Sequence, residues 1–387
     1  MKKENRGRKA KRVIVTAAAV FLALLLTGVL IFRKEIGTVM SMQRIDGTNL
    51  YCMEYQPEYD LDELLQMGTE DVDDMIGYIV YRLSHKLLPP SFFRNVGLSY
   101  SNFACTCFSA EAESGNKLFC RNFDYGEEGA ILLSSHPKKG YASMSFCTPV
   151  YAGVDARQLA SHSPARLLTL ALLYFPMDGM NEKGLAITVN EMTHHPTWQD
   201  TEKPDILTPV VLRLVLDRCA TVDEAVELIR QIDVHDPRYD LGAPDVVGSS
   251  YHYLIADAEG SSAVVEFDYE DGFRVMCVPK EADKSYQICT NHYLSEKFAG
   301  EGDEVGDTYG RYEYADSVLR EKKPALEDCF SVLSATRMDR VLYAEYGDYY
   351  CSTQWSAVYD LTDRCVSVCV GQDYDRVYTF ALEQSNP

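Results

Sequence analysis

Cysteine, arginine and aspartate side chains gather in two short stretches of the chain. The first is Cys105-Thr106-Cys107-Phe108, and the second, after Gly115, is Cys120-Arg121-Asn122-Phe123-Asp124. Two β-rich runs, 105–110 and 117–123, flank a turn signal at 114–116 and predict a hairpin. Cys105 then begins one strand, and Arg121 and Asp124 lie on or just past its neighbour. A cation near a thiol lowers the thiol pKa, and a carboxylate holds and tunes an amine.

These residue types suit a cysteine whose own α-amine removes the thiol proton. An α-amino group titrates at about 7.7–8.0, so it is a well-matched general base. The amine does not exist while Ala104 is attached, so cleavage before Cys105 would switch the chemistry on. On the residues alone a second interpretation stays open, in which Cys105 is a buried small apolar residue and Arg121–Asp124 is an ordinary ion pair.

The same motifs resemble the opening of the choloylglycine hydrolase and penicillin V acylase family, with its Cys-Thr start and its Gly-Arg-Asn-Leu/Phe-Asp signature. The arginine follows the cysteine by sixteen residues and the aspartate follows it by nineteen, as in that family. The resemblance continues in order over 105–387, and its later matches are listed here: Asp178 to Leu185 (DGMNEKGL), His252 to Asp257, Val265-Glu266, Thr290-Asn291, Arg311 and Ala357 to Asp360.

The resemblance implies a role for six residues. Cys105 is the expected nucleophile, Asp124 orients its freed amine, and Arg121 polarises the site. Asn190 and Asn291 resemble the two oxyanion donors of the family, and Arg311 completes the polar network around the thiol. Amide side chains suit that task because they present N–H dipoles without adding charge.

The resemblance also implies the fold class and the reaction. The implied fold is a four-layer αββα sandwich of the N-terminal-nucleophile type. The residue pattern itself predicts the α+β class, with an N-terminal transmembrane helix and a helical pre-segment before the sandwich. The reaction is hydrolysis of a linear amide C–N bond through a thioester acyl-enzyme, with no metal or organic cofactor. Expected substrates are small N-acyl amides, such as conjugated bile acids, penicillin side-chain amides or N-acyl lipids. Acyl transfer to another amine stays open.

Three departures from the family bear on these roles. Bile-salt hydrolases have one more residue than this chain between the Gly-Leu of the DGMNEKGL motif and the asparagine that Asn190 resembles. Cys120 replaces the usual glycine before Arg-Asn and crowds that strand. In this chain 104 residues precede Cys105. A long segment before the cysteine is similar to acid-ceramidase-like members that have a propeptide.

The first residues of the chain predict an anchor. Seven Lys/Arg and one Glu give residues 1–12 a formal charge of +6. Because the whole chain has a formal net charge of −21, the remaining residues carry −27. The uncharged stretch 13–32 is long enough, at about 30 Å of helix, to span a bilayer. The basic flank then stays in the cytoplasm and the catalytic part lies outside. A cleaved signal peptide followed by secretion is the alternative.

We expect three parts along the chain. Residues 1–32 are the basic tail and anchor, 33–104 a polar stem (33–60) and helical propeptide-like segment (helix 61–88), and 105–387 the catalytic domain. Beyond the hairpin we expect strands at 141–146, 167–174, 185–190, 251–257, 263–269, 286–291, 356–360, 366–370 and 377–382, and helices at 209–219, from Thr221 and at 310–321. Thr221 and Glu224 fit a capping box.

Composition and missing motifs exclude other functions. The acidic body would repel nucleic-acid phosphates, so no nucleic-acid partner is expected. The twelve cysteines form no CxxC pair, so no zinc ribbon is expected, and their disulfide pairing stays unassigned, as does the oligomeric state. Two further functions stay open: an unprocessed, anchored binding protein of the same fold, and a papain-like thiol hydrolase that uses His252 or His292 as its base.

Overall fold

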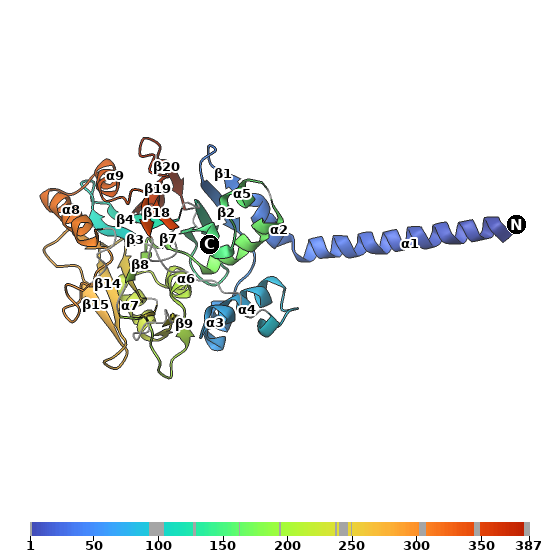
Figure 1. Cartoon of the computed structure of the whole chain (residues 1–387), viewed down its shortest axis with the longest axis horizontal. Helices are drawn as coiled ribbons and strands as arrows, with labels where there is room; N and C mark the ends of the chain where they lie inside the picture. The colour runs from blue at the N-terminus through green and yellow to red at the C-terminus, as the bar shows by residue number, and fades with distance from the viewer. Residues whose placement is uncertain are drawn as a thin grey trace.

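Two β-sheets form the body of the protein, and one long helix projects from it (Figure 1). The computed structural model describes residues 2–92, 104–126, 129–161, 163–192, 195–236, 238–239, 247–248, 250–301, 307–343 and 349–382. In these ranges the chain is a mixed α+β protein, which confirms the expected class at that level.

The first sheet has nine strands in the described residues. Their spatial order is β1 (Gln43–Arg44), β2 (Leu50–Tyr55), β5 (Ala130–Ser135), β6 (Ser143–Cys147), β7 (Asp178–Asn181), β8 (Ala186–Met192), β13 (Ser250–Ala256), β14 (Ser262–Asp268) and β15 (Arg274–Pro279). All neighbours are antiparallel except β2 and β5, which pair in parallel from Leu50–Ala130 to Tyr55–Ser135.

The second sheet carries the Cys105 hairpin among its inner strands. Its order is β16 (Tyr286–Cys289), β3 (Ala104–Glu111), β4 (Lys117–Tyr125), β18 (Tyr349–Asp360), β19 (Cys365–Val370) and β20 (Tyr378–Ala381), with β17 (Val341–Tyr343) paired to β18. The β3–β4 hairpin confirms the sequence prediction. Gly115 sits in its turn at φ +92°, a conformation that glycine adopts without steric cost.

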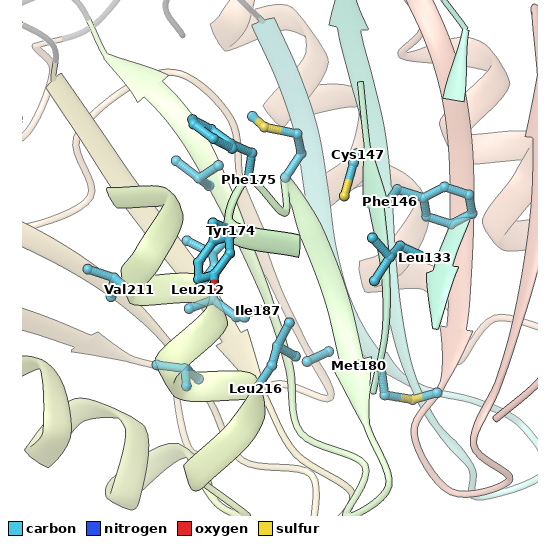
Figure 2. Close-up of a cluster of buried hydrophobic side chains, with 14 of the residues drawn as sticks. Leu133, Phe146, Cys147, Tyr174, Phe175, Met180, Ile187, Val211, Leu212 and Leu216 are labelled. Atoms are coloured by element: carbon cyan, nitrogen blue, oxygen red, sulfur yellow. The ribbon is translucent and has the colours of Figure 1, made fainter. Parts of the chain in front are cut away.

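Helices cover the outer faces of both sheets. The helices α6 (Thr208–Arg218) and α7 (Val222–Arg230) pack on the first sheet, and α8 (Thr308–Glu321) and α9 (Leu326–Ala335) pack on the second. Strand β3 contacts β8 and β13, so the two sheets face each other at the hairpin. Figure 2 shows Val211, Leu212 and Leu216 of α6 gathered with the core side chains of the first sheet, such as Ile187.

Smaller elements complete the described fold. They are α5 (Ala156–Ala160), the 3₁₀ segments η1 (Pro90–Phe92), η2 (Pro149–Ala152) and η3 (Pro164–Tyr174), and the short pairs β9 (Asp205–Ile206) with β10 (Asp233–Val234) and β11 (Arg238–Tyr239) with β12 (Val247–Gly248).

The strand expected at 167–174 was wrong, because this segment is the helical η3. Ser163 accepts a hydrogen bond from Ala165 N at 3.2 Å, and Pro164 occupies the first turn. An apolar run of this length has no periodicity that separates a strand from a buried helix.

The N-terminal segment differs from the expected stem and single helix. The helix α1 (Lys2–Ile31) is followed by α2 (Arg33–Ser41) and then by β1 and β2, whose Leu50 is fully buried. The expected helix 61–88 is two helices, α3 (Leu61–Met67) and α4 (Val72–Leu83). Gly68 ends α3 at φ +73°, and the Asp71 side chain begins α4 by accepting from Asp74 N at 2.9 Å.

One described helix segment, Ile14–Ile31, is long and apolar enough to cross a membrane, with a mean hydropathy of 2.7. It lies outside the body of the protein, and none of it is buried (Figure 1).

Candidate active site

Hairpin register decides which face each candidate residue occupies. Cys105 lies opposite Phe123, and Cys107 lies opposite Arg121. Directly paired residues of antiparallel strands point to the same face, so the Cys105 and Arg121 side chains both enter the space between the sheets. Asp124 lies opposite Ala104, on the other face of the hairpin.

The Arg121 guanidinium reaches the Cys105 sulfur. Its Nη2 lies 3.0 Å from Cys105 Sγ and also donates to Val189 O at 2.9 Å. Its Nη1 donates to Met177 O and Thr188 Oγ1 and lies 3.3 Å from Asp178 Oδ2. Burial raises the pKa of the Cys105 thiol, and the charge of Arg121 opposes that rise.

Asn291 and Arg311 hold the backbone of Cys105. Cys105 N donates to Asn291 Oδ1 at 3.0 Å, and Arg311 Nη2 donates to the same oxygen at 2.9 Å. Arg311 Nη1 donates to Cys105 O and, at 2.8 Å, to Thr106 Oγ1. The nucleophile candidate is therefore fixed at its sulfur by one arginine and at its main chain by another.

The Asp124 carboxyl has one oxygen without a partner. Its Oδ1 accepts a hydrogen bond from Thr353 Oγ1, while Oδ2 is buried and has no partner in the described part of the chain. Burial raises the pKa of Asp124 to about 6, although Arg311 and Thr353 act in the opposite direction. An unused acceptor thus lies across the hairpin from Ala104, the residue before Cys105.

Asn190 lies beside this group without contacting Cys105 directly. Its Oδ1 accepts from Cys107 Sγ at 2.9 Å, and its Nδ2 donates to Thr290 O at 3.0 Å and to Cys289 O at 3.3 Å. The amide therefore ties β8 to the end of β16, next to Asn291. The other four predicted residues, Arg121, Asp124, Asn291 and Arg311, are brought together around Cys105.

Asp178, Thr188 and Thr353 are polar contacts of the site that sequence reasoning did not single out. Asp178 belongs to the DGMN motif, so its resemblance was visible, but its pairing with Arg121 across the two sheets was not. Thr188 and Thr353 are ordinary strand residues, and nothing in the sequence distinguished them.

The two histidine candidates for a papain-like base are engaged elsewhere. In the described structure His252 Nε2 bonds Thr290 O at 2.7 Å, and its ring faces Cys289 Sγ at 3.3 Å. His292 Nδ1 bonds Thr290 Oγ1 at 2.9 Å, and burial lowers the pKa of His292 to about 4. In the described structure the Cys105 sulfur contacts Val189 O and Arg121, which does not favour a cysteine–histidine pair at Cys105.

All twelve cysteines, each within the described residues, are unbridged. Cys105 itself is fully buried in the uncleaved chain.

Comparison with known proteins places this geometry in a family. The sequence profile described as acyl-coenzyme A:6-aminopenicillanic acid acyl-transferase matches residues 111–375, more than half of the chain. This chain belongs to that family. Membership agrees with the resemblance to the choloylglycine hydrolases and penicillin V acylases. Within the family match lie Arg121, Asp124, Asn190, Asn291 and Arg311, whereas Cys105 precedes it.

Individual relatives of the family match in sequence or in fold. A penicillin V acylase of Pectobacterium atrosepticum is 35% identical over 121 residues, which cover 30% of this chain and only 29% of that protein. A conjugated bile acid hydrolase variant of Clostridium perfringens has a TM-score of 0.50 at 17% identity, covering 73% of this chain and 94% of the other. A penicillin V acylase of Agrobacterium tumefaciens has a TM-score of 0.43 at 19% identity, covering 69% and 83%. At these identities, the similarity to the bile acid hydrolase concerns the fold alone.

Proposed function

We propose that this protein is a hydrolase of linear amide C–N bonds, with Cys105 as an N-terminal nucleophile exposed by cleavage after Ala104. The observation that carries the proposal is the set of polar groups around Cys105. Its sulfur faces Arg121, its main-chain nitrogen faces Asn291, and an unpartnered Asp124 oxygen lies opposite Ala104. These positions serve a thiolate and the amine that cleavage would create.

The processing step uses the same nucleophile. The Cys105 thiol adds to the Ala104 carbonyl, the peptide C–N bond breaks, and Cys105 N takes a proton to become an amine. Water then hydrolyses the resulting thioester, leaving the Ala104 carboxylate and the free thiol. Asp124 Oδ2 and Asn291 Oδ1 are acceptors near the new amine and hold it beside the sulfur.

Amide hydrolysis follows with the amine as base. The amine takes the thiol proton, and the thiolate adds to the carbonyl of an N-acyl substrate. Asn291 Nδ2, which donates to Glu191 O at 2.7 Å in the uncleaved chain, supplies an N–H for the developing oxyanion. The ammonium returns the proton to the leaving amine, and water releases the acyl group from the thioester.

Arg121, Arg311 and Asn190 support these steps. Arg121 stabilises the thiolate, and Arg311 fixes Asn291 and the Cys105 carbonyl. Because the amide of Asn190 is taken up by Thr290 O and Cys107, we assign it to positioning the strand end that carries Asn291.

Fold and location extend the proposal. The helix pairs on the outer faces of two facing sheets support a four-layer αββα sandwich. The basic residues before Ile14–Ile31 support a single-pass anchor with its N-terminus in the cytoplasm and the catalytic part outside. Secretion after signal cleavage remains the alternative location.

Substrate assays test the proposal. Purified full-length protein in detergent is incubated with glycine- and taurine-conjugated bile acids, penicillin V and N-acyl amino acids of several chain lengths, and the released amines are quantified. We expect release with at least one class and loss of activity in Cys105→Ala. Cys277→Ala, which removes a half-buried thiol on β15, serves as the control and keeps wild-type activity. Equal activity in Cys105→Ala would exclude the proposed nucleophile.

Acyl transfer is a second candidate, because the matching family is described by an acyl-transferase activity. Adding a second amine, such as 6-aminopenicillanic acid, to the same assay separates the two. A new N-acyl product at the expense of free acid indicates transfer, and free acid alone indicates hydrolysis. A binding protein that keeps the fold would give neither product.

A further inference from the structure

Asp178 is a buried carboxyl group that the proposed reaction has not used. It is the first residue of the DGMN motif, at the start of β7, and its side chain is fully buried. Trp355 Nε1 donates to Asp178 Oδ2 at 3.1 Å, and Tyr359 Oη donates to Asp178 Oδ1. Both donors come from β18, in the opposite sheet. A carboxylate buried so completely needs a cation as well as hydrogen bonds.

Arg121 is that cation, and its two terminal nitrogens face different partners. Nη1 lies 3.3 Å from Asp178 Oδ2, whereas Nη2 lies 3.0 Å from Cys105 Sγ. Because a guanidinium is planar and rigid, fixing one nitrogen also sets the direction of the other.

The rest of the motif fixes Asp178 in β7. A Cβ on Gly179 would lie 2.7 Å from Met144 O, so only glycine fits there without a shift. Asn181 Nδ2 donates to Leu216 O at 2.9 Å and to Cys219 O at 2.7 Å, which ties β7 to α6. The motif thus holds the Asp178 main chain between the neighbouring strand β6 and a helix.

We infer that Asp178 is a positioning residue of the proposed active site: it holds Arg121 so that Nη2 faces Cys105, and its negative charge limits how strongly Arg121 stabilises the thiolate. This inference rests on the proposed function, since it requires Cys105 to be the nucleophile.

Several charged and titratable groups surround the Asp178–Arg121–Cys105 arrangement, which is called the relay below. Arg121 faces Cys105, Asp178 and Cys107, and Asp124, on the other face of the hairpin, is near enough for its charge to act on Cys105. Tyr359 and Cys147 lie near Asp178, and Tyr151, Cys289 and Cys351 lie near Cys105. Burial raises the pKa of the Asp178 carboxyl, and Arg121 opposes the rise. Asp178 is therefore the carboxyl group that forms an ion pair with the arginine at the thiol.

Two substitutions of Asp178 separate charge from position. Asp178→Asn keeps an acceptor for Arg121 but removes the charge, so the arginine is less neutralised and the Cys105 thiol pKa falls by about one unit. Asp178→Ala removes the partner itself, so Arg121 Nη2 leaves the sulfur and the thiol pKa rises. In Asp178→Ala we expect kcat to fall at least about tenfold while KM changes less than about twofold.

The measurement is the pH dependence of Cys105 alkylation by iodoacetamide. Full-length protein in detergent is labelled between pH 5 and 10, and the peptide that begins at Cys105 is quantified by mass spectrometry, beside kcat and KM. Tyr359→Phe keeps the carboxylate and removes one hydrogen bond, and its expected loss of kcat is about threefold. If Asp178→Ala does not fold, Asp178→Asn and Tyr359→Phe carry the test.

Asp217→Asn is the matched control. Asp217 pairs with Arg213 at 2.6 Å, and both side chains are almost completely buried, so this variant breaks a second buried ion pair away from Cys105. Its alkylation midpoint and kcat should equal wild type even though its melting temperature falls. A folded Asp178 variant that remains uncleaved, while Asp217→Asn is cleaved, also supports the relay.

Two distinct failures are recognisable. Wild-type midpoints and kcat in the folded Asp178 variants, with normal labelling of Cys105, would overturn the relay and leave the proposed function standing. No labelling of Cys105 in active wild type, with full activity in Cys105→Ala, would overturn the proposed function and the relay with it.

Discussion

At the residue scale, the site combines two arginines and a buried carboxyl group around one thiol, and each contributes differently. Arg121 faces the sulfur, whereas Arg311 faces the main chain of the same residue. Two atoms of these groups, Arg121 Nε and Asp124 Oδ2, have no hydrogen-bond partner in the described, uncleaved chain, and only the second is an acceptor. Cleavage would create an amine donor for it.

Asp124 should make the uncleaved chain less stable as pH rises. Its folded pKa of about 6 lies above the ordinary aspartate value of 3.8, so the folded state holds the proton more tightly. The resulting stability is fully present below about pH 4 and is lost as pH rises through 6, on the order of 3 kcal/mol. Urea unfolding of Cys105→Ala with and without Asp124→Asn, at pH 4 to 7.5, measures it. A pH-independent difference between the two chains would contradict the assignment.

Asn291 and Asn190 should differ in their effects on turnover. Removing an oxyanion donor costs about 10²–10³ in kcat, so Asn291→Ala should fall in that range with little change in KM. Asn190→Ala should lose about tenfold, because Asn190 acts through Thr290 and β16. Steady-state measurements of kcat and KM for both processed variants test this difference. Equal losses would show that Asn190 is itself a donor to the oxyanion.

Residue-level prediction from sequence worked where spacing carried the information. The interval from Cys105 to Arg121 fits a hairpin register, and the structure places the arginine at the sulfur. Prediction failed where contact depends on two sheets facing each other. Asp178 reaches Arg121 only because β7 and β4 lie in different sheets, and no local pattern reports that distance.

At the element scale, the main departure from the sequence prediction is β2. The sequence prediction places β2 inside a polar stem (33–60), yet Leu50 to Tyr55 joins the first sheet in parallel with β5. Parallel strands that lie far apart in the chain are not joined by a short turn, so the sequence carries no local signal that predicts the pairing of β2 with β5. By contrast, the helix start at Thr221 was visible, and Thr221 Oγ1 does accept Glu224 N, at 3.3 Å.

Because β2 belongs to the first sheet, we predict that the segment before Cys105 stays bound to the catalytic part after cleavage between Ala104 and Cys105. Leu50→Ala should destabilise the Cys105→Ala chain by about 2–5 kcal/mol, as expected for a buried leucine. Met40→Ala, at a side chain that is 79% exposed on α2, should change stability by less than about 0.5 kcal/mol. Urea unfolding measures both, and co-elution of the pieces in size exclusion tests their association. Separation without denaturant would contradict an integral β2.

At the scale of the whole molecule, the body and α1 are structurally separate. The segment Ile14–Ile31 is not buried against the rest of the protein, whereas α2 packs on β2 and η3. Deleting residues 2–31 should therefore leave the fold and the processing intact while removing the attachment to the membrane.

Membrane fractionation checks this separation. Full-length protein should pellet with membranes and resist alkaline carbonate, and the deletion variant should stay in the supernatant. A truncated chain that still resists extraction would show that another surface holds the membrane. If the protein expressed from the full-length sequence were found in the soluble fraction without α1, that result would instead favour a cleaved signal peptide.

The most direct test of the central claim is the N-terminal sequence and intact mass of the mature protein, measured beside a Cys105→Ala control. We predict a catalytic chain that begins at Cys105 and a control that remains whole. A wild-type chain that is uncleaved between Ala104 and Cys105 yet hydrolyses amides would contradict the proposed mechanism.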